Sequence, residues 1–310
     1  MTHPATRAEW LIFLALGFMW GSSYLFIKLA VDSFGTFTLV ALRLLIGAAF
    51  LWAVLRLSRT PLPVDRRAYG HLFVMSIINI AIPFGLITWA EQSVDSALAA
   101  ILNSTVPLFV IVIAPLFLPD EPIRLNGLLG LVIGFLGVVL IVSPGLAEAA
   151  GTVPGQVALL GSSFSYAVGN VYARRNVRGL APLIPAVFQV TFALLIVSGL
   201  AIVLERPWET AQPDAEAWFA IVWLGILGSG LAYLAYFRLL ARWGATRTSL
   251  VAYLLPVVGI VLGYLVLQEP IDATLISGTA LVIAGVALVN ARWGRRRLFA
   301  PAEPVPVEPV

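Results

Sequence analysis

Cysteine is absent from this sequence of 310 residues, histidine occurs only twice, and charged residues make up just 11% of the chain. Without cysteine the chain has no disulfide, no thiol nucleophile and no cysteine-ligated metal. A soluble domain contains about 25% charged residues, so this chain has too few to cover a globular surface. The composition therefore disfavours a cytosolic enzyme, a nucleic-acid-binding protein and a secreted module.

Clustered positive charge is also lacking. The net charge is +3, and eighteen arginines and the single lysine, Lys28, are scattered among apolar runs. A protein that binds nucleic acid gathers such residues into a patch that contacts phosphates. We expect no nucleic-acid partner, and we interpret the basic residues as determinants of membrane topology.

Long apolar runs are the main feature that is present, since 60% of the residues are apolar and the mean hydropathy is +0.96. A helix needs about 20 apolar residues to cross the hydrocarbon core. Runs near that length lie at roughly residues 10–30, 36–56, 70–90, 96–118, 126–143, 155–174, 182–204, 217–237, 246–267 and 273–291. Strands of a membrane barrel alternate polar and apolar residues, whereas these runs are apolar on every face. The sequence predicts an all-α integral membrane protein with ten transmembrane helices.

The arginines predict the orientation of these helices, because Lys and Arg near helix ends are retained on the cytoplasmic side. If the N-terminus is cytoplasmic, that side holds Arg7. It also holds the arginines between Arg56 and Arg297 that lie in the tail or in a connection from an even-numbered run to the next run. The opposite side holds one clear cation, Arg206. The first run is too long for a signal peptide. We expect a multi-pass protein with both termini in the cytoplasm.

An internal repeat relates the two halves of the chain. Residues 102–123 match residues 252–271, so that Pro107 lies opposite Pro256, and a Glu-Pro-Ile motif ends both segments. Each unit has an odd number of helices, so the second enters the membrane with opposite polarity. We predict a tail at 1–9, one five-helix repeat at 10–145, an inverted five-helix repeat at 154–291, and a basic, then proline-rich tail at 292–310. Inverted repeats occur in secondary transporters, which bind substrate near the bilayer midplane between the repeats.

The first half contains several distinctive motifs, namely Trp20-Gly21-Ser22-Ser23-Tyr24 with Lys28, then Arg43, residues 96–100 leading to Pro107-Leu108-Phe109, and Asp120-Glu121-Pro122. Together these motifs resemble the EamA domain of the drug/metabolite transporter superfamily. The second half matches clearly from 248 to 285, but residues 161–166 depart from the Trp-Gly-Ser pattern. The resemblance covers residues 10–291. It implies a ten-helix exporter of small metabolites in a bacterial inner membrane, similar to amino-acid and aromatic amino-acid exporters.

Lys28 and Arg43 are cations within the predicted helices. Lys28 is near the outer end of the first run, where it either extends to the membrane interface or faces the cavity. Arg43 is about a third of the way into the second run, where it faces the cavity or pairs with a carbonyl or carboxylate. Intramembrane charges mark functional sites, and a cation in a cavity binds carboxylate or phosphate. We predict both as substrate-binding residues.

Prolines interrupt two runs, and polar residues cluster around them. Pro107 and Pro256 each remove a main-chain hydrogen bond near mid-helix, and we predict both as hinges. The other predicted substrate-binding residues are Trp20, Ser23, Tyr24, Asn79, Trp89, Asn103, Ser104, Tyr166, Asn170, Gln189, Tyr233 and Tyr253, with Tyr236, Thr248 and Ser249 as further candidates. The alternatives are structural kinks, an interfacial aromatic belt and hydrogen bonds between helices.

Glycines at 127, 130, 134 and 137 recur every three or four residues along one run. Small residues at this spacing let helices approach closely. We interpret them as a packing face, either within the repeat or at a dimer contact.

Groups that would drive transport or catalysis are missing. The chain has no nucleotide-binding loop, which needs a Gly-rich segment followed by lysine. No histidine pair, acidic pair or nucleophile with its base shares a helix face. We therefore expect no enzyme, no cofactor and no metal. Acidic residues fall at the ends of runs or in loops, with Glu91 closest to the membrane interior, whereas proton-coupled antiporters need a deep carboxylate.

These features predict a secondary transporter that exports small metabolites, amino acids or related solutes in particular, by alternating access across the bacterial inner membrane. We expect a uniporter or weakly coupled exporter whose partners are a small-molecule substrate and the lipid bilayer, and which is a monomer or a homodimer. The alternatives are a proton-coupled exporter of drugs or nucleobases and a protein similar to a lipid flippase.

Overall fold

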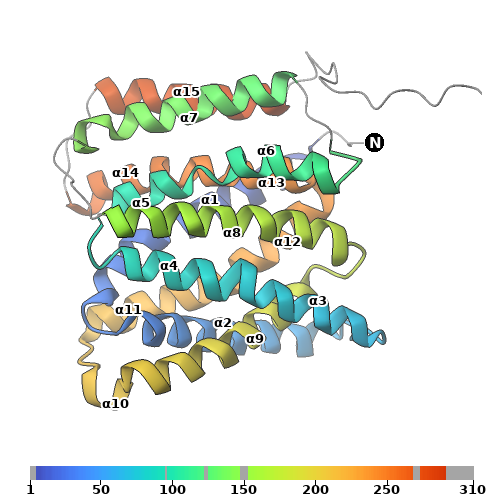
Figure 1. Ribbon diagram of the computed structural model, residues 1–310, viewed down its shortest axis with the longest axis vertical. Coiled ribbons are helices and arrows are strands. Elements are labelled where there is room, and N and C mark those ends of the chain that lie inside the picture. Colours follow the sequence, from blue (N-terminus) through green and yellow to red (C-terminus); the bar gives the residue numbers. More distant parts are fainter. Residues whose placement is uncertain (1–4, 95, 122–124, 147–152, 268–272, 291–310) are drawn as a thin grey trace, which may run out of the picture.

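The computed structural model describes residues 5–94, 96–121, 125–146, 153–267 and 273–290. Within these ranges every regular element is a helix (Figure 1), which confirms the predicted all-α class. The tail at 292–310 and the second Glu-Pro-Ile motif, with Glu269, lie outside the described residues.

The helices follow one another with short connections, and most run along a common direction (Figure 1). The first half contains α1 (Arg7–Val31), α2 (Thr36–Ser58), α3 (Arg66–Ser76), η1 (Ile77–Ala81), α4 (Ile82–Ala90), α5 (Ser96–Asn103), α6 (Val106–Phe117) and α7 (Leu125–Leu146). The second half contains α8 (Val153–Asn176), α9 (Leu183–Leu200), η2 (Ala201–Glu205), α10 (Pro207–Thr210), α11 (Ala215–Trp223), η3 (Leu224–Leu231), α12 (Ala232–Trp243), α13 (Ala245–Ser249), η4 (Leu250–Tyr253), α14 (Leu254–Leu267) and α15 (Ala273–Asn290). The segments η1, η2 and η3 are π-helical, and η4 is a 3₁₀ turn.

Several of these helices have the length and composition of membrane spans. Six stretches qualify: Arg7–Val31, Thr36–Ser58, Arg66–Ala90, Ala99–Phe117, Leu183–Glu205 and Ala215–Trp243. Two shorter apolar helices cover Leu125–Gly137 and Ile276–Val289. Large apolar side chains such as Val112, Leu195 and Val203 are exposed on the outside of the bundle. A soluble monomer rarely exposes so much contiguous apolar surface, whereas lipid would cover it.

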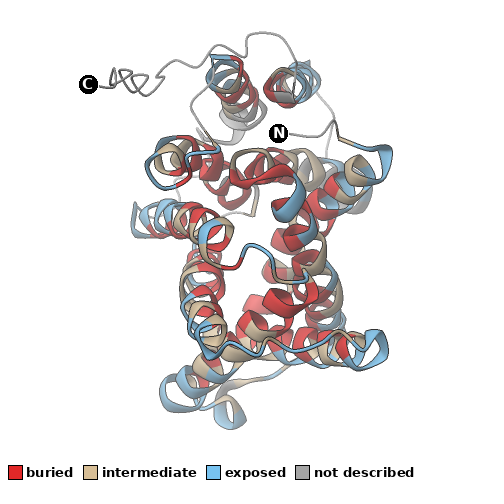
Figure 2. Ribbon diagram, turned by 90° about the vertical axis from the view of Figure 1, so that its right-hand side faces the viewer, coloured by how far each residue is buried: buried red, intermediate tan, exposed pale blue. Residues whose placement is uncertain are grey.

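Helices from the two halves of the chain pack against each other throughout the bundle. α1 contacts α14, α2 contacts α9, and α4 contacts α8. Trp52 on α2, for example, donates from Nε1 to Thr191 Oγ1 on α9 at 3.0 Å. Buried residues gather on the sides of the helices that face one another (Figure 2). The interior is therefore built jointly by both halves.

The glycine face on α7 packs against α15, and Figure 1 shows these two helices side by side. A Cβ atom added to Gly130 would lie 2.6 Å from the carbonyl oxygen of Gly285. One added to Gly137 would lie 2.7 Å from the carbonyl oxygen of Gly278. Only glycine allows this approach, so the packing role is confirmed, with α15 as the partner. Gly127 has no neighbour within 4 Å and takes no part in the contact.

Candidate substrate cavity

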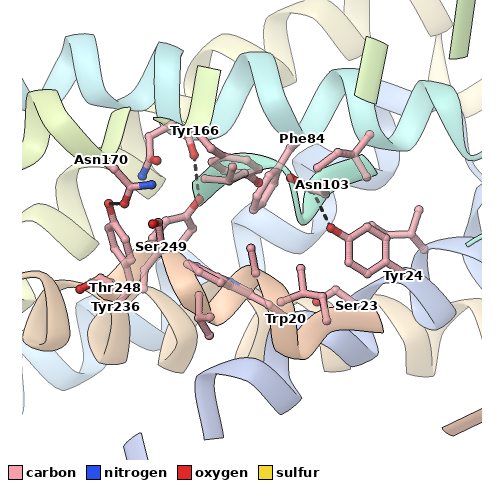
Figure 3. Close-up of a pocket in the computed structure, with 18 of the residues that line it drawn as sticks. Trp20, Ser23, Tyr24, Phe84, Asn103, Tyr166, Asn170, Tyr236, Thr248 and Ser249 are labelled. Atoms are coloured by element: carbon pink, nitrogen blue, oxygen red, sulfur yellow. Dashed lines mark hydrogen bonds between the residues drawn. The ribbon is translucent and has the colours of Figure 1, made fainter. Parts of the chain in front are cut away.

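A cavity of about 80 Å³ lies between helices of both halves (Figure 3). Its lining consists of Trp20, Ser23, Tyr24, Ile27, Arg43, Asn79, Phe84, Ile87, Asn103, Val106, Tyr166, Asn170, Tyr233, Tyr236, Thr248, Ser249, Val251, Ala252 and Leu255. Pockets that hold drug-sized ligands enclose about 300–1,000 Å³. In this conformation the cavity is therefore contracted, and a solute of several heavy atoms requires its walls to move apart.

Arg43 supplies the positive charge of the cavity wall. Its side chain on α2 is 3% exposed, and Nε donates to Ser229 Oγ on η3 at 3.2 Å. The guanidinium carbon lies 4.2 Å from the ring centroid of Phe84. Among the described residues no carboxylate lies within 4.0 Å of the guanidinium. A buried cation is costly without a counter-charge, so the site favours an anionic group on a bound solute.

A proline in the third apolar run, Pro83, follows the π-helical segment η1 near the cavity. Proline lacks the N–H that would donate to the carbonyl of Asn79, four residues earlier, and the neighbouring carbonyl of Ile78 also has a side-chain donor. Both carbonyls accept from the second half of the chain. Tyr233 Oη donates to the Asn79 carbonyl at 2.9 Å, and Ser165 Oγ donates to the Ile78 carbonyl at 2.6 Å. The broken helix thereby positions Asn79 and Tyr233 together at the cavity.

Two pairs of polar side chains around the cavity are hydrogen-bonded to each other. Asn103 Nδ2 donates to Tyr24 Oη at 2.6 Å, and Tyr236 Oη donates to Asn170 Oδ1 at 2.7 Å (Figure 3). The Trp20 ring packs against the Tyr236 ring with centroids 5.7 Å apart. The cavity thus combines aromatic faces, which suit apolar groups, with amide and hydroxyl groups that can exchange hydrogen bonds with a solute.

A carboxylate is buried beside the cavity without contributing to its lining. Glu91 caps the C-terminus of α4 and its residue is 0% exposed. Lys28 on α1 donates from Nζ to the main-chain oxygen of Glu91 at 2.9 Å. Neither carboxylate oxygen of Glu91 has a hydrogen-bond partner within the described part of the chain. The sequence placed Glu91 at the end of an apolar run, and the structure adds that it is buried there.

Two other carboxylates join the halves at opposite ends of the bundle. Glu121 accepts from the main-chain N–H groups of Ala245 and Thr246, at 2.6 and 2.8 Å, at the start of α13. Glu205 accepts from the N–H groups of Phe37 and Thr38, both at 2.8 Å, at the start of α2. A carboxylate at a helix N-terminus satisfies free donors and interacts favourably with the helix dipole. We call these contacts the Glu121 clasp and the Glu205 clasp.

The comparison with known proteins also divides the chain into two halves. Residues 7–143 and residues 153–291 each match the model of the EamA-like transporter family. The chain belongs to this family. It is therefore a membrane transporter, and the resemblance found in the sequence motifs is confirmed.

Relatives of this EamA-like protein are similar over nearly their whole length. An Escherichia coli K12 protein described as the uncharacterized inner membrane transporter YedA is 30% identical, over 96% of this chain and 93% of its own. A Bacillus subtilis protein described as the uncharacterized transporter YoaV is 24% identical, over 92% of this chain and 97% of its own. A crystal structure of a protein 22% identical covers 92% of this chain and 96% of its own with a TM-score of 0.75, so the two share a fold.

Most of the predicted substrate-binding residues of this EamA-like protein meet at the cavity. Those that line it are Trp20, Ser23, Tyr24, Arg43, Asn79, Asn103, Tyr166, Asn170 and Tyr233, together with the further candidates Tyr236, Thr248 and Ser249. They come from elements of both halves that are far apart in the sequence. Their role in binding stays a prediction, which this convergence supports.

Five predicted binding residues lie outside the lining. Lys28 contacts the Glu91 carbonyl, and Trp89 is 46% exposed on the outside of the bundle. Ser104 Oγ donates to the Ile101 carbonyl at 2.6 Å, which satisfies a carbonyl within its own helix end. Gln189 and Tyr253 are fully buried: Gln189 Oε1 accepts from Asn79 Nδ2 at 3.2 Å, and Tyr253 Oη donates to the Leu131 carbonyl at 3.0 Å.

The helix irregularities lie where two predicted hinges were expected. α5 ends at Asn103 and α6 begins one residue before Pro107. The 3₁₀ turn η4 changes to α14 two residues before Pro256. Sequence reasoning overlooked Pro83, although the same proline signal was present, and it overlooked the apolar lining residue Phe84. Apolar lining residues such as Ile87 carry no local signal, because they resemble the rest of every apolar run.

Proposed function

We propose that this membrane transporter exports small solutes that carry a carboxylate, such as amino acids, across the inner membrane of a bacterium. Arg43 carries the proposal, as a buried guanidinium on the cavity wall that no carboxylate pairs with among the described residues. Arginine binds carboxylates through two parallel hydrogen bonds. The aromatic faces of Trp20 and Tyr166 would contact the apolar part of the same solute.

We further propose that ten transmembrane helices form two inverted five-helix repeats, with both termini in the cytoplasm. The separate family matches at 7–143 and 153–291 support two repeats. The clasps support an arrangement in which each half closes one end of the bundle. In the proposed orientation the Glu121 clasp lies at the cytoplasmic end, together with the contact from Trp243 Nε1 to Glu9 Oε2 at 3.2 Å. Alternating access then requires these contacts to open in turn.

Counterflow in proteoliposomes tests the substrate class. Vesicles loaded with an unlabelled amino acid would take up the same labelled amino acid faster than protein-free vesicles. The matching amines without the carboxylate, and nucleobases, would exchange far more slowly. Faster exchange of amines or nucleobases would contradict the proposed substrate class. Translocation of a fluorescent phospholipid, measured in the same vesicles, would indicate a lipid flippase instead.

A further inference from the structure

Glu91 has an environment that does not suit a permanently ionised carboxylate. It lies where α4 ends, its residue is 0% exposed, and neither carboxylate oxygen has a hydrogen-bond partner among the described residues. A buried, unpaired carboxylate is strongly destabilised, and such a group becomes neutral by taking up a proton. The geometry therefore fits the protonated acid.

Among the described residues, the charged and titratable groups that act on Glu91 come from two helices. α1 contributes Lys28 and Tyr24, and α2 contributes Arg43. α8 also packs against α4, but its Tyr166 interacts with Arg43 and Tyr24 rather than with Glu91. Within the described residues, Lys28 and Arg43 are thus the cations that would stabilise an ionised Glu91.

Lys28 is bound in a way that leaves the carboxylate free. Its Nζ donates to the Glu91 main-chain oxygen at 2.9 Å, and among the described residues it lies beyond 4.0 Å from every carboxylate oxygen. The lysine side chain is long and flexible, so a rotamer change can bring the ammonium to the carboxylate once it loses its proton. Residue 91 therefore has two self-consistent states, protonated with Lys28 on the carbonyl and ionised with Lys28 on the carboxylate.

Glu91 is also coupled to the cavity through its neighbours. Ile87, one helical turn before it on α4, lines the cavity, as do Tyr24 and Arg43. A solute carboxylate bound at Arg43 would weaken the stabilisation that Arg43 gives to an ionised Glu91. Binding of an anionic solute therefore favours protonation of Glu91, so that solute and proton would cross in the same direction and export would be driven by the outward gradient of the solute.

We propose that Glu91 is a proton-binding site that couples proton movement to solute movement, with Lys28 as its alternative charge partner. A proton adds to a carboxylate oxygen of Glu91 in one conformation and leaves it in the other, and only this O–H bond forms and breaks. The inference rests on the proposed transport function for its coupling role. It replaces the expectation of uniport, which rested on the absence of a carboxylate deep in the membrane, because Glu91 lies at a helix end but is fully buried.

Infrared difference spectroscopy of the purified protein, recorded between neutral and alkaline pH, tests the proton site without any substrate. We expect a carbonyl stretching band of a protonated carboxylic acid at neutral pH that is lost in Glu91→Gln. The band should persist in the matched control Glu216→Gln, which removes an exposed carboxylate at the start of α11. An unchanged band in Glu91→Gln would overturn the proposal. Glu91→Asp provides a second variant, in which the band should shift in frequency, and an unshifted band would also overturn it.

Transport into vesicles under an imposed pH gradient, with the outside more acidic than the inside, tests the coupling. The measured quantity is the ratio of labelled amino-acid uptake with the gradient to uptake without it. We expect a ratio several-fold above one for the unmodified chain and a ratio close to one for Glu91→Gln. Equal ratios in both proteins would overturn the coupling role. If the unmodified chain exchanges no amino acid in counterflow, the proposed substrate class fails, while the infrared band still decides whether Glu91 binds a proton.

Discussion

Arg43 is the residue on which the proposed substrate class depends. Its charge is inside the protein, its Nε donates to the Ser229 hydroxyl, and its guanidinium lies over the Phe84 ring. Arg43 also lines the cavity. A carboxylate on a bound solute would therefore supply both a counter-charge and hydrogen-bond acceptors.

Arg43→Ala should therefore abolish counterflow of solutes that carry a carboxylate. Loss of one member of a buried charge pair costs about 2–5 kcal/mol, which corresponds to roughly 30-fold or more in affinity. Counterflow of a labelled amino acid would be compared with Arg238→Ala, which removes an exposed arginine from α12. Size-exclusion chromatography would verify that both variants are folded. Unchanged counterflow in Arg43→Ala would assign Arg43 to packing or topology.

The helix that contains Pro83 depends on the second half of the chain for hydrogen bonds to its main-chain carbonyls. Its carbonyls at Ile78 and Asn79 accept hydrogen bonds from Ser165 and Tyr233. Within a membrane an unsatisfied carbonyl has no water to bind. The break therefore links α4 to α8 and α12 as well as shaping the cavity.

Tyr233→Phe should lower the stability of the protein by about 1–3 kcal/mol, because it leaves the Asn79 carbonyl without its donor. The same substitution should cost less in the Pro83→Ala background, where alanine restores a main-chain N–H that can bind this carbonyl. Thermal unfolding of the four proteins in detergent forms a double-mutant cycle. Equal costs in both backgrounds would show that the tyrosine hydroxyl does not compensate for the proline.

Glycine residues set the distance between the helices α7 and α15. Gly130→Ala should force the two helices apart and destabilise the protein by about 1–3 kcal/mol, as overpacking of a close contact does. Gly127→Ala is the matched control, because no atom lies within 4 Å of its Cβ position, and alanine favours helix. The melting temperature should fall in the first variant and be unchanged or higher in the second. Equal melting temperatures would contradict this packing role.

In the molecule as a whole, features that recur along the chain could be predicted from the sequence. Features that depend on contacts between distant residues could not. Apolar runs and the prolines at 107 and 256 are local signals, and the helices and their irregularities follow them. Glu91 ends an apolar run, as the sequence indicated, but its local sequence does not show that it is buried. Its burial depends on the packing of the helices around the end of α4. Likewise, Gln189 resembled a cavity residue, but tertiary packing pairs it with Asn79.

The proposed orientation also concerns the whole molecule, and the absence of cysteine makes it directly testable. Val64, in the connection between α2 and α3, is 97% exposed, and Trp208 on α10 is 67% exposed. In the proposed orientation the arginine-rich connection between α2 and α3 lies in the cytoplasm, and Trp208 lies outside. In intact cells a membrane-impermeant maleimide should therefore label Trp208→Cys and leave Val64→Cys unlabelled until the membrane is permeabilised. The unmodified chain gives the background of the measurement. The opposite labelling pattern would show that the protein has the reverse orientation. The Glu121 clasp would then lie at the outer end, and protons would reach Glu91 from the cytoplasm.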